Sequence, residues 1–218
     1  TTASLVFGAQ VPGSPPQGGQ TEEYNGSSWS EQNDLGTARA KLAGCGTQTA
    51  GLGFGGYQPT IPSQPKQKAQ TEQYDGTSWS EVSDMVTATN AGGGAGTQTA
   101  AIAFGGYNGT ANIATTQDWN GTAWTTSSAS LGAGVSNNAG AGTSTSALSM
   151  GGYAPSTAAT INVEEYNVSI NTITAGAWSS TPALNTARFL IAGAGTSTAA
   201  LASGGQTSNP TKVGNVEE

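Results

Sequence analysis

The chain has 218 residues, of which 33 are glycine and only 9% are charged, well below the roughly 25% usual in soluble domains. Its net charge of −7 includes only six basic residues, too few to neutralise a phosphate backbone, so we expect no nucleic-acid partner. The apolar stretches are far shorter than the roughly 20 residues that a membrane helix needs, so we expect no membrane insertion.

One unit of about 50 residues recurs along the chain. Its first marker is Gly46–Tyr57 (Gly-Thr-Gln-Thr-Ala-Gly-Leu-Gly-Phe-Gly-Gly-Tyr), which returns at 96–107, 142–153 and 195–205. Its second marker is 21–29, which returns at 71–79, 116–124 and 163–178. One tryptophan and one glycine doublet therefore mark the same structural positions in successive copies: Trp29, Trp79, Trp124 and Trp178, with Gly55, Gly56, Gly105, Gly106, Gly151, Gly152, Gly204 and Gly205.

The second copy shows the predicted elements in chain order. A first strand falls near 38–48 and a second at 49–54, where Leu52 and Phe54 alternate with glycines, so that one face is bulky and the other nearly bare. A third strand at 70–74 leads through a predicted tight type I′ turn at Asp75-Gly76 into a fourth strand at Trp79. The same hairpin signal occurs at 25–26 and 120–121, and 167–176 replaces it with a longer loop.

Four-stranded units with a Gly-Gly pair and a periodic aromatic residue are typical of propeller blades. The pattern predicts an all-β chain forming one β-propeller domain over 1–218, with four-stranded antiparallel blades at roughly 1–37, 38–86, 87–131, 132–185 and 186–218. The first copy supplies strands two to four and the last supplies strands one to three, giving 18 strands where five complete blades need 20. We therefore expect further chain, or another subunit in a homo-oligomer, to complete the propeller.

The repeat resembles the kelch repeat. The resemblance is carried by the Gly-Gly doublet, the Glu-Glu-Tyr or Glu-Gln-Tyr sequence, the tryptophan about five residues later, and the arginines Arg39 and Arg188. The variant Tyr-Asn-Gly-Ser-Ser-Trp together with Gly-Thr-Gln-Thr-Ala also resembles repeats in virion proteins of tailed marine phages, such as tail-fibre and decoration proteins. The third copy departs from the pattern, with Trp119 at the tyrosine position and 134–138 where the arginine falls.

The side-chain inventory argues against catalysis. The chain has no histidine and one cysteine, Cys45, so we expect no metal site, no cofactor and no enzymatic activity. Kelch-type copper oxidases hold their copper with the help of histidine, which this chain lacks. The segment 75–79 is similar to the Asp-box motif of sialidases. A sialidase needs an arginine cluster, however, and this chain has only Arg39 and Arg188. We interpret Cys45 as a buried small residue, and Arg39 and Arg188 as ties between a loop and a neighbouring blade.

Three features remain as candidates for binding. Tyr57, Tyr107 and Tyr153 follow the glycine doublets, so they are expected on one rim, where they either bind a ligand or cover the neighbouring blade. Carboxylates recur before the tyrosine position, either as a cation-binding ring or as charges that protect an outer edge strand: Glu22, Glu23, Glu72, Asp118, Glu164, Glu165, Glu217 and Glu218. The Pro-rich loops 58–69 and 11–20 are candidate contact surfaces.

The resemblance and the inventory together favour a non-catalytic structural or adhesive protein of a phage particle. Its expected location is the virion, and its expected partners are other virion proteins or a host surface glycan or protein. The alternative is a carbohydrate-binding propeller lectin outside any virion, secreted or at a cell surface. Thr1 in place of Met indicates a processed start or an excerpt of a longer chain.

Overall fold

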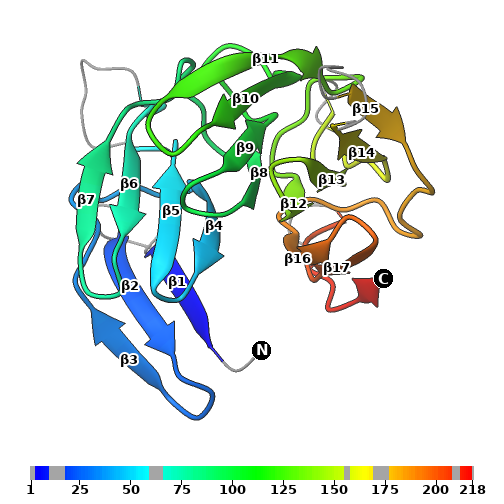
Figure 1. The fold of residues 1–218 in the computed structure, drawn as a ribbon. Helices are drawn as coiled ribbons and strands as arrows, with labels where there is room; N and C mark the ends of the chain where they lie inside the picture. Colours follow the sequence, from blue (N-terminus) through cyan, green and yellow to red (C-terminus); the bar gives the residue numbers. More distant parts are fainter. Residues whose placement is uncertain are drawn as a thin grey trace.

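The structure, a computed structural model, describes residues 3–9, 18–58, 66–154, 158–168, 177–207 and 212–217. These residues form 18 strands in five antiparallel sheets that are arranged radially around a common axis, as in a five-bladed β-propeller (Figure 1). The predicted fold class is therefore confirmed. No helix long and apolar enough to cross a membrane occurs within these ranges.

The first sheet consists of β1 (Ser4–Ala9), β2 (Gly18–Tyr24) and β3 (Trp29–Gln32). The second contains β4 (Ala43–Thr47), β5 (Ala50–Phe54), β6 (Thr71–Tyr74) and β7 (Trp79–Val82). The third contains β8 (Gly93–Gly96), β9 (Ala101–Phe104), β10 (Thr115–Trp119) and β11 (Trp124–Ser130). The fourth contains β12 (Ala139–Gly142), β13 (Ser146–Met150), β14 (Val163–Asn167) and β15 (Ala177–Ser180), and the fifth contains β16 (Ala192–Thr196), β17 (Ala199–Ser203) and β18 (Val216–Glu217).

The innermost strand of each complete sheet lies next to the innermost strand of the following one, in the order β4, β8, β12 and β16. Within each sheet the strands pair in chain order from the axis outward. The register identifies β1 as a second strand, because Phe7 pairs with Thr21 as Phe54 pairs with Thr71. The first and fifth sheets thus contain strands two to four and one to three, as the repeat pattern predicts.

Sheets pack by placing a bulky face against a bare one. The positions of Gly51 and Gly53 illustrate this, since a Cβ atom there would lie 2.7 Å from Leu5 and 2.8 Å from Phe7 of the preceding sheet. The same positions of the later sheets hold alanine or serine, and Phe54, Phe104 and Met150 take the place of Phe7. These positions hold glycine, alanine or serine because only small residues allow neighbouring sheets to approach closely.

In the second, third and fourth sheets, a tryptophan on the fourth strand links the sheet to the one before. The indole Nε1 of Trp79, Trp124 and Trp178 donates a hydrogen bond to Thr21, Thr71 and Thr116, over 2.8, 2.9 and 3.0 Å. Each indole also contacts a phenylalanine of the preceding sheet, Phe7, Phe54 or Phe104. The repeat tryptophans therefore mark one structural position, as predicted.

Replacing Thr71 by valine should lower the free energy of unfolding by about 1–3 kcal/mol, because the buried Trp124 N–H would lose its acceptor. Thr71→Ser keeps the hydroxyl and is the matched control. Denaturant unfolding of both variants measures the difference. A T71V variant within ~0.5 kcal/mol of the wild type would contradict a stabilising role for this hydrogen bond.

The hairpins between third and fourth strands lie where predicted, but the predicted turn type is wrong. A type I′ turn needs positive φ at both central residues, whereas only the glycines have it, with φ of 98° at Gly26, 93° at Gly76 and 93° at Gly121. Each loop instead contains four residues between the paired strand ends. The side chain of Asn25, Asp75 or Asn120 accepts hydrogen bonds from the backbone N–H groups two and three residues later.

These backbone donors hold the pKa of Asp75 below its usual value, and Ser78 contributes most. A lowered pKa means that the folded state favours the charged form of Asp75. The resulting stability is present above the unfolded pKa near 3.8 and is lost as the pH falls through the folded value. We expect unfolding midpoints of the wild type and Asp75→Asn to converge below about pH 4, since Asn at the two equivalent positions makes the same turn. Midpoints that stay parallel from pH 7 through the acid range in which the folded Asp75 gains its proton would contradict this expectation.

Crossing loops lead from the last strand of one sheet to the first of the next, and comprise 33–42, 83–92, 131–138 and 181–191. Near the axis each contains one residue other than glycine with a positive φ of 54° to 56°, namely Lys41, Ala91, Asn137 and Leu190. Their backbones are linked in series, since the N–H of Ala91, Asn137 and Leu190 donates to the carbonyl of the preceding member. We call these four residues the axial series.

Candidate functional site

The three predicted rim tyrosines occupy one structural position. Tyr57, Tyr107 and Tyr153 each follow a glycine doublet and bridge to the crossing loop on one side and to the loop before the third strand on the other. The fifth sheet has Gln206 at this position. All three tyrosines are half-buried.

One of these tyrosines contacts the neighbouring blade, and a second is bonded within its own loop. The ring of Tyr153 stacks on Phe189, a crossing-loop residue of the next sheet, at 3.9 Å between ring centroids. The hydroxyl of Tyr107 donates to the carbonyl of Gly109 in its own loop, over 2.9 Å. Asn90 and Ser136 occupy the position of Phe189 in the crossing loops that follow Tyr57 and Tyr107, because each of the three residues bridges to the next rim position. Neither Tyr57 nor Tyr107 therefore has an aromatic partner equivalent to Phe189.

Arg39 is fully buried and joins the first crossing loop to the second sheet. Its guanidinium donates to Glu72 Oε1 at 2.9 Å and to the carbonyl of Gln70 at 2.8 Å. Glu72 Oε2 in turn accepts the backbone N–H of Gly36 at 2.7 Å. Burial lowers the pKa of Arg39, and the charge of Glu72 opposes this effect. Arg39 thus has the expected structural role, but the expected partner is wrong, because it holds the crossing loop to the sheet of its own copy and not to a neighbouring blade. Both charges are used inside the protein.

Arg188 repeats this arrangement in the fifth sheet. It donates to Glu217 Oε1 at 2.7 Å and to the carbonyl of Asn215 at 2.7 Å, and Glu217 accepts the backbone N–H of Asn185. The third sheet uses a neutral version in which the amide of Gln117 binds the N–H and the carbonyl of Thr87. In the fourth sheet Glu164 accepts the N–H of Gly132 at 2.7 Å.

These contacts change the interpretation of the repeated carboxylates. They lie on third strands, which are paired on both sides in the complete sheets, so the interpretation as protection of an outer edge is wrong. The first carboxylate of the pair anchors the crossing loop, as at Glu72, Glu164 and Glu217. The second can link sheets, since Glu23 accepts from Tyr74 at 2.8 Å and Gln48 at 3.1 Å. The described ranges contain no cluster of three or more acidic or cysteine side chains that could hold a metal.

Cys45 takes the place of a small residue on the innermost strand of its sheet. Its thiol is half-buried and donates to the carbonyl of Thr97 at 3.6 Å. Burial raises the pKa of Cys45 to about 12. The thiol is therefore protonated at neutral pH, which makes it a poor nucleophile.

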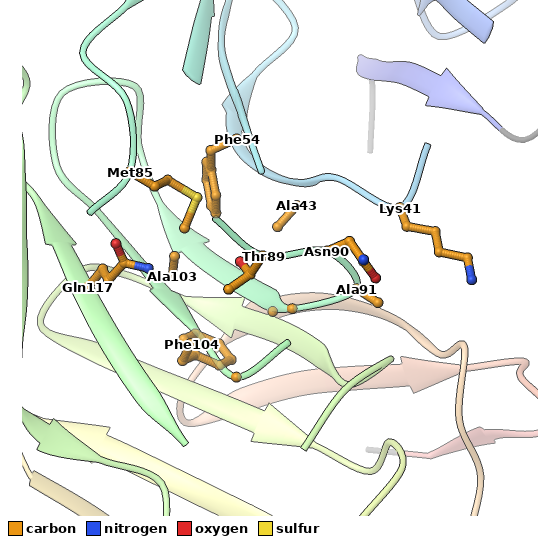
Figure 2. Close-up of a pocket in the computed structure, with 13 residues that line it drawn as sticks. Lys41, Ala43, Phe54, Met85, Thr89, Asn90, Ala91, Ala103, Phe104 and Gln117 are labelled. Carbon is orange, nitrogen blue, oxygen red and sulfur yellow. The ribbon is translucent and has the colours of Figure 1, made fainter. Parts of the chain in front are cut away.

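Cavities in the described ranges differ in kind. Figure 2 shows the gap between the second and third sheets, where Phe54, Met85 and Phe104 surround a cavity of about 10 Å³ while Lys41 extends away from it. That volume is room for one water at most. A groove of about 520 Å³ lies beside the fifth sheet, lined by apolar side chains such as Leu148, Met150, Val163 and Leu184. It occupies the place where the other sheets carry a fourth strand and its tryptophan.

The Pro-rich candidate surfaces lie mostly outside the described residues, which exclude 10–17 and 59–65. The same applies to most of the longer hairpin loop at 167–176. No protein-family model matches the sequence, and no curated protein matches it.

Proposed function

We propose that this protein is a non-catalytic structural or adhesive propeller of a phage particle, acting in a tail fibre, in receptor binding or as decoration. We also propose that its repeats are of the kelch type and that its location is the virion. The observation that carries the proposal is the use of the buried charges. An enzyme such as a sialidase would use arginines to bind the carboxylate of its substrate. Here Arg39 and Arg188 are each bound to a glutamate and to backbone carbonyls.

The architecture supports this role because its stability resides in the repeated ties, while the rim and connecting loops differ between copies. Loops on a rigid scaffold are where binding surfaces form. A particle protein needs such a scaffold together with a variable surface. The expected partners are other virion proteins or a glycan or protein on the host surface.

Particle fractionation tests the proposal. An antibody raised against the purified chain should label particles purified by density gradient from the source culture, and should label free protein weakly. Pre-incubation of host cells with the purified chain should reduce particle adsorption if the role is receptor binding, whereas a decoration role leaves adsorption unchanged. Detection of the chain only in cell extracts, and never in particles, would rule out a virion protein.

The second candidate is a carbohydrate-binding lectin outside any virion. It is favoured by one observation, the half-buried Tyr57 and Tyr107 at equivalent rim positions. Aromatic faces at a rim are suited to stacking on sugars. A glycan array should then show binding that Tyr57→Ala and Tyr107→Ala weaken. Binding that both variants retain, or an array without binding, would exclude this candidate.

A further inference from the structure

The first and fifth sheets each expose a face that is covered in the other sheets. On the fifth sheet this end face consists of Ala192, Ala194, Leu201, Ser203 and Val216, with Val216 57% exposed and Leu201 38% exposed. On the first sheet it consists of Ser4, Val6 and Trp29, with Val6 51% exposed and Trp29 52% exposed. We call these two surfaces the tail face and the head face.

Both faces are equivalent to buried surfaces elsewhere in the chain. Ala139 and Ala141, at the positions of Ala192 and Ala194, are buried in the core between the fourth and fifth sheets. Gly53, at the position of Val6, contacts Phe7 of the preceding sheet. Trp124, at the position of Trp29, is only 5% exposed. The first glycine of the fifth-sheet doublet is also open, since a Cβ atom at Gly204 would meet nothing closer than 3.8 Å.

The interior interfaces follow one rule for size and hydrogen bonding. A bulky second-strand residue such as Phe7 or Phe54 meets a small residue on the next sheet, and a neighbouring third-strand threonine accepts the tryptophan N–H. Phe54 and Thr71 are cross-strand partners, so the ring and the hydroxyl lie side by side on one face.

The head and tail faces exchange these features in a matched way. On the tail face, Ser203 stands where the others have Phe or Met, and its cross-strand partner Val216 stands where three sheets have Thr. On the head face, Val6 stands where the others have Gly, Ala or Ser. Compared with the interior interfaces, the side chain at Ser203 is smaller and the side chain at Val6 is larger. The hydroxyl that is absent at Val216 is present at Ser203. Such compensation is expected of two surfaces that pack against each other.

We propose that the tail face of one copy of this protein packs against the head face of a second copy, head to tail. Val6 fills the space above Ser203, the ring of Trp29 lies on Val216, and the Trp29 N–H donates to the Ser203 hydroxyl. A second copy is the proposed occupant because the described residues carry both complementary faces and both faces are exposed. The interface is heterologous, so it produces either a closed ring of copies or an open fibre. This inference does not depend on the proposed virion role.

Cross-linking tests the pairing directly. All variants carry Cys45→Ala, which the third, fourth and fifth sheets already have at the equivalent positions Ala95, Ala141 and Ala194. Val6→Cys chains mixed with Ser203→Cys chains should form a mixed dimer with a short bismaleimide. Val6→Cys mixed with Val86→Cys is the matched control, because Val86 is 58% exposed but lies on neither face.

The doubly substituted chain, V6C with S203C, separates two arrangements. It should give a ladder of covalent oligomers. A cross-linked monomer alone would mean that the faces meet within one chain, and would overturn the proposal. No mixed dimer, with a monomeric mass by light scattering at every concentration, would also overturn it.

Association strength gives an independent readout. Val6→Arg places an unpaired charge in the interface and should weaken self-association at least about tenfold, or ~1.4 kcal/mol. Val86→Arg should leave association unchanged. Both sites are exposed, so melting temperatures at low protein concentration should match the wild type and show that both variants fold. Equal association of V6R and wild type would refute the assigned contact.

Discussion

Replacing Arg39 by alanine should lower the free energy of unfolding by about 3–5 kcal/mol, the largest effect we expect from a single side chain. The substitution leaves the carboxylate of Glu72 buried without its cation, and breaking one partner of a buried ion pair has a cost of this size. It also removes the hydrogen bond to the Gln70 carbonyl. Reversible denaturant unfolding gives the measurement.

The third sheet supplies a matched control for this prediction. It carries Thr89 and Gln117 at the positions of Arg39 and Glu72, and the Gln117 amide holds the crossing loop without any charge. The double variant Arg39→Thr with Glu72→Gln should therefore recover most of the stability that R39A loses. If the double variant is as unstable as R39A, the cost comes from lost packing of the arginine and the ion-pair explanation fails.

Replacing Gly55 by alanine should destabilise the protein by several kcal/mol for two separable reasons. Its φ of 68° lies in the left-handed region, which costs a residue with a Cβ atom roughly 1–2 kcal/mol. In addition, the new Cβ atom would lie 2.6 Å from the carbonyl oxygen of Thr89 in the crossing loop of the next sheet. Backbone shifts to relieve such overpacking add about 1–3 kcal/mol.

Gly204 isolates the first contribution. It has nearly the same φ, 66°, but its nearest atom would be 3.8 Å from the new Cβ atom. Gly204→Ala should therefore show the conformational cost alone, and the difference between the two variants measures the contact between sheets. Unfolding should be followed at low protein concentration, where the tail face is free. Equal effects of the two substitutions would show that the neighbouring loop yields without cost.

The sequence was sufficient to predict the propeller because each copy repeats the same physical solution. The alternation around Leu52 and Phe54 predicts a bulky face and a bare one, and the structure confirms both. The spacing of Trp79 and Trp124 predicts equivalent fourth strands, and these tryptophans make the same hydrogen bond. The turn type was wrong because Asn-Gly is compatible with several turns, and the four-residue loop length determines which one forms.

Other features of the structure could not be predicted from the type of any single residue, because they depend on contacts between distant parts of the chain. Lys41 and Leu190 adopt a left-handed conformation that their residue types do not favour, because hydrogen bonds between crossing loops impose it. The carboxylate of Glu72 could not be assigned to the crossing loop, since its partner Gly36 lies 36 residues away in sequence. The rim position of the tyrosines followed from the repeat, whereas the stacking of Tyr153 on Phe189 depends on one residue of the fifth copy. Whether the rim binds a ligand stays a prediction.

The axial series links successive copies in the same way, whatever their side chains. Its links use main-chain atoms alone, so the four side chains are free to be as different as lysine, alanine, asparagine and leucine. A gene duplication that inserts a whole copy brings with it one new donor and one new acceptor, and the series stays unbroken. The pattern of these links therefore does not depend on which side chains stand near the axis.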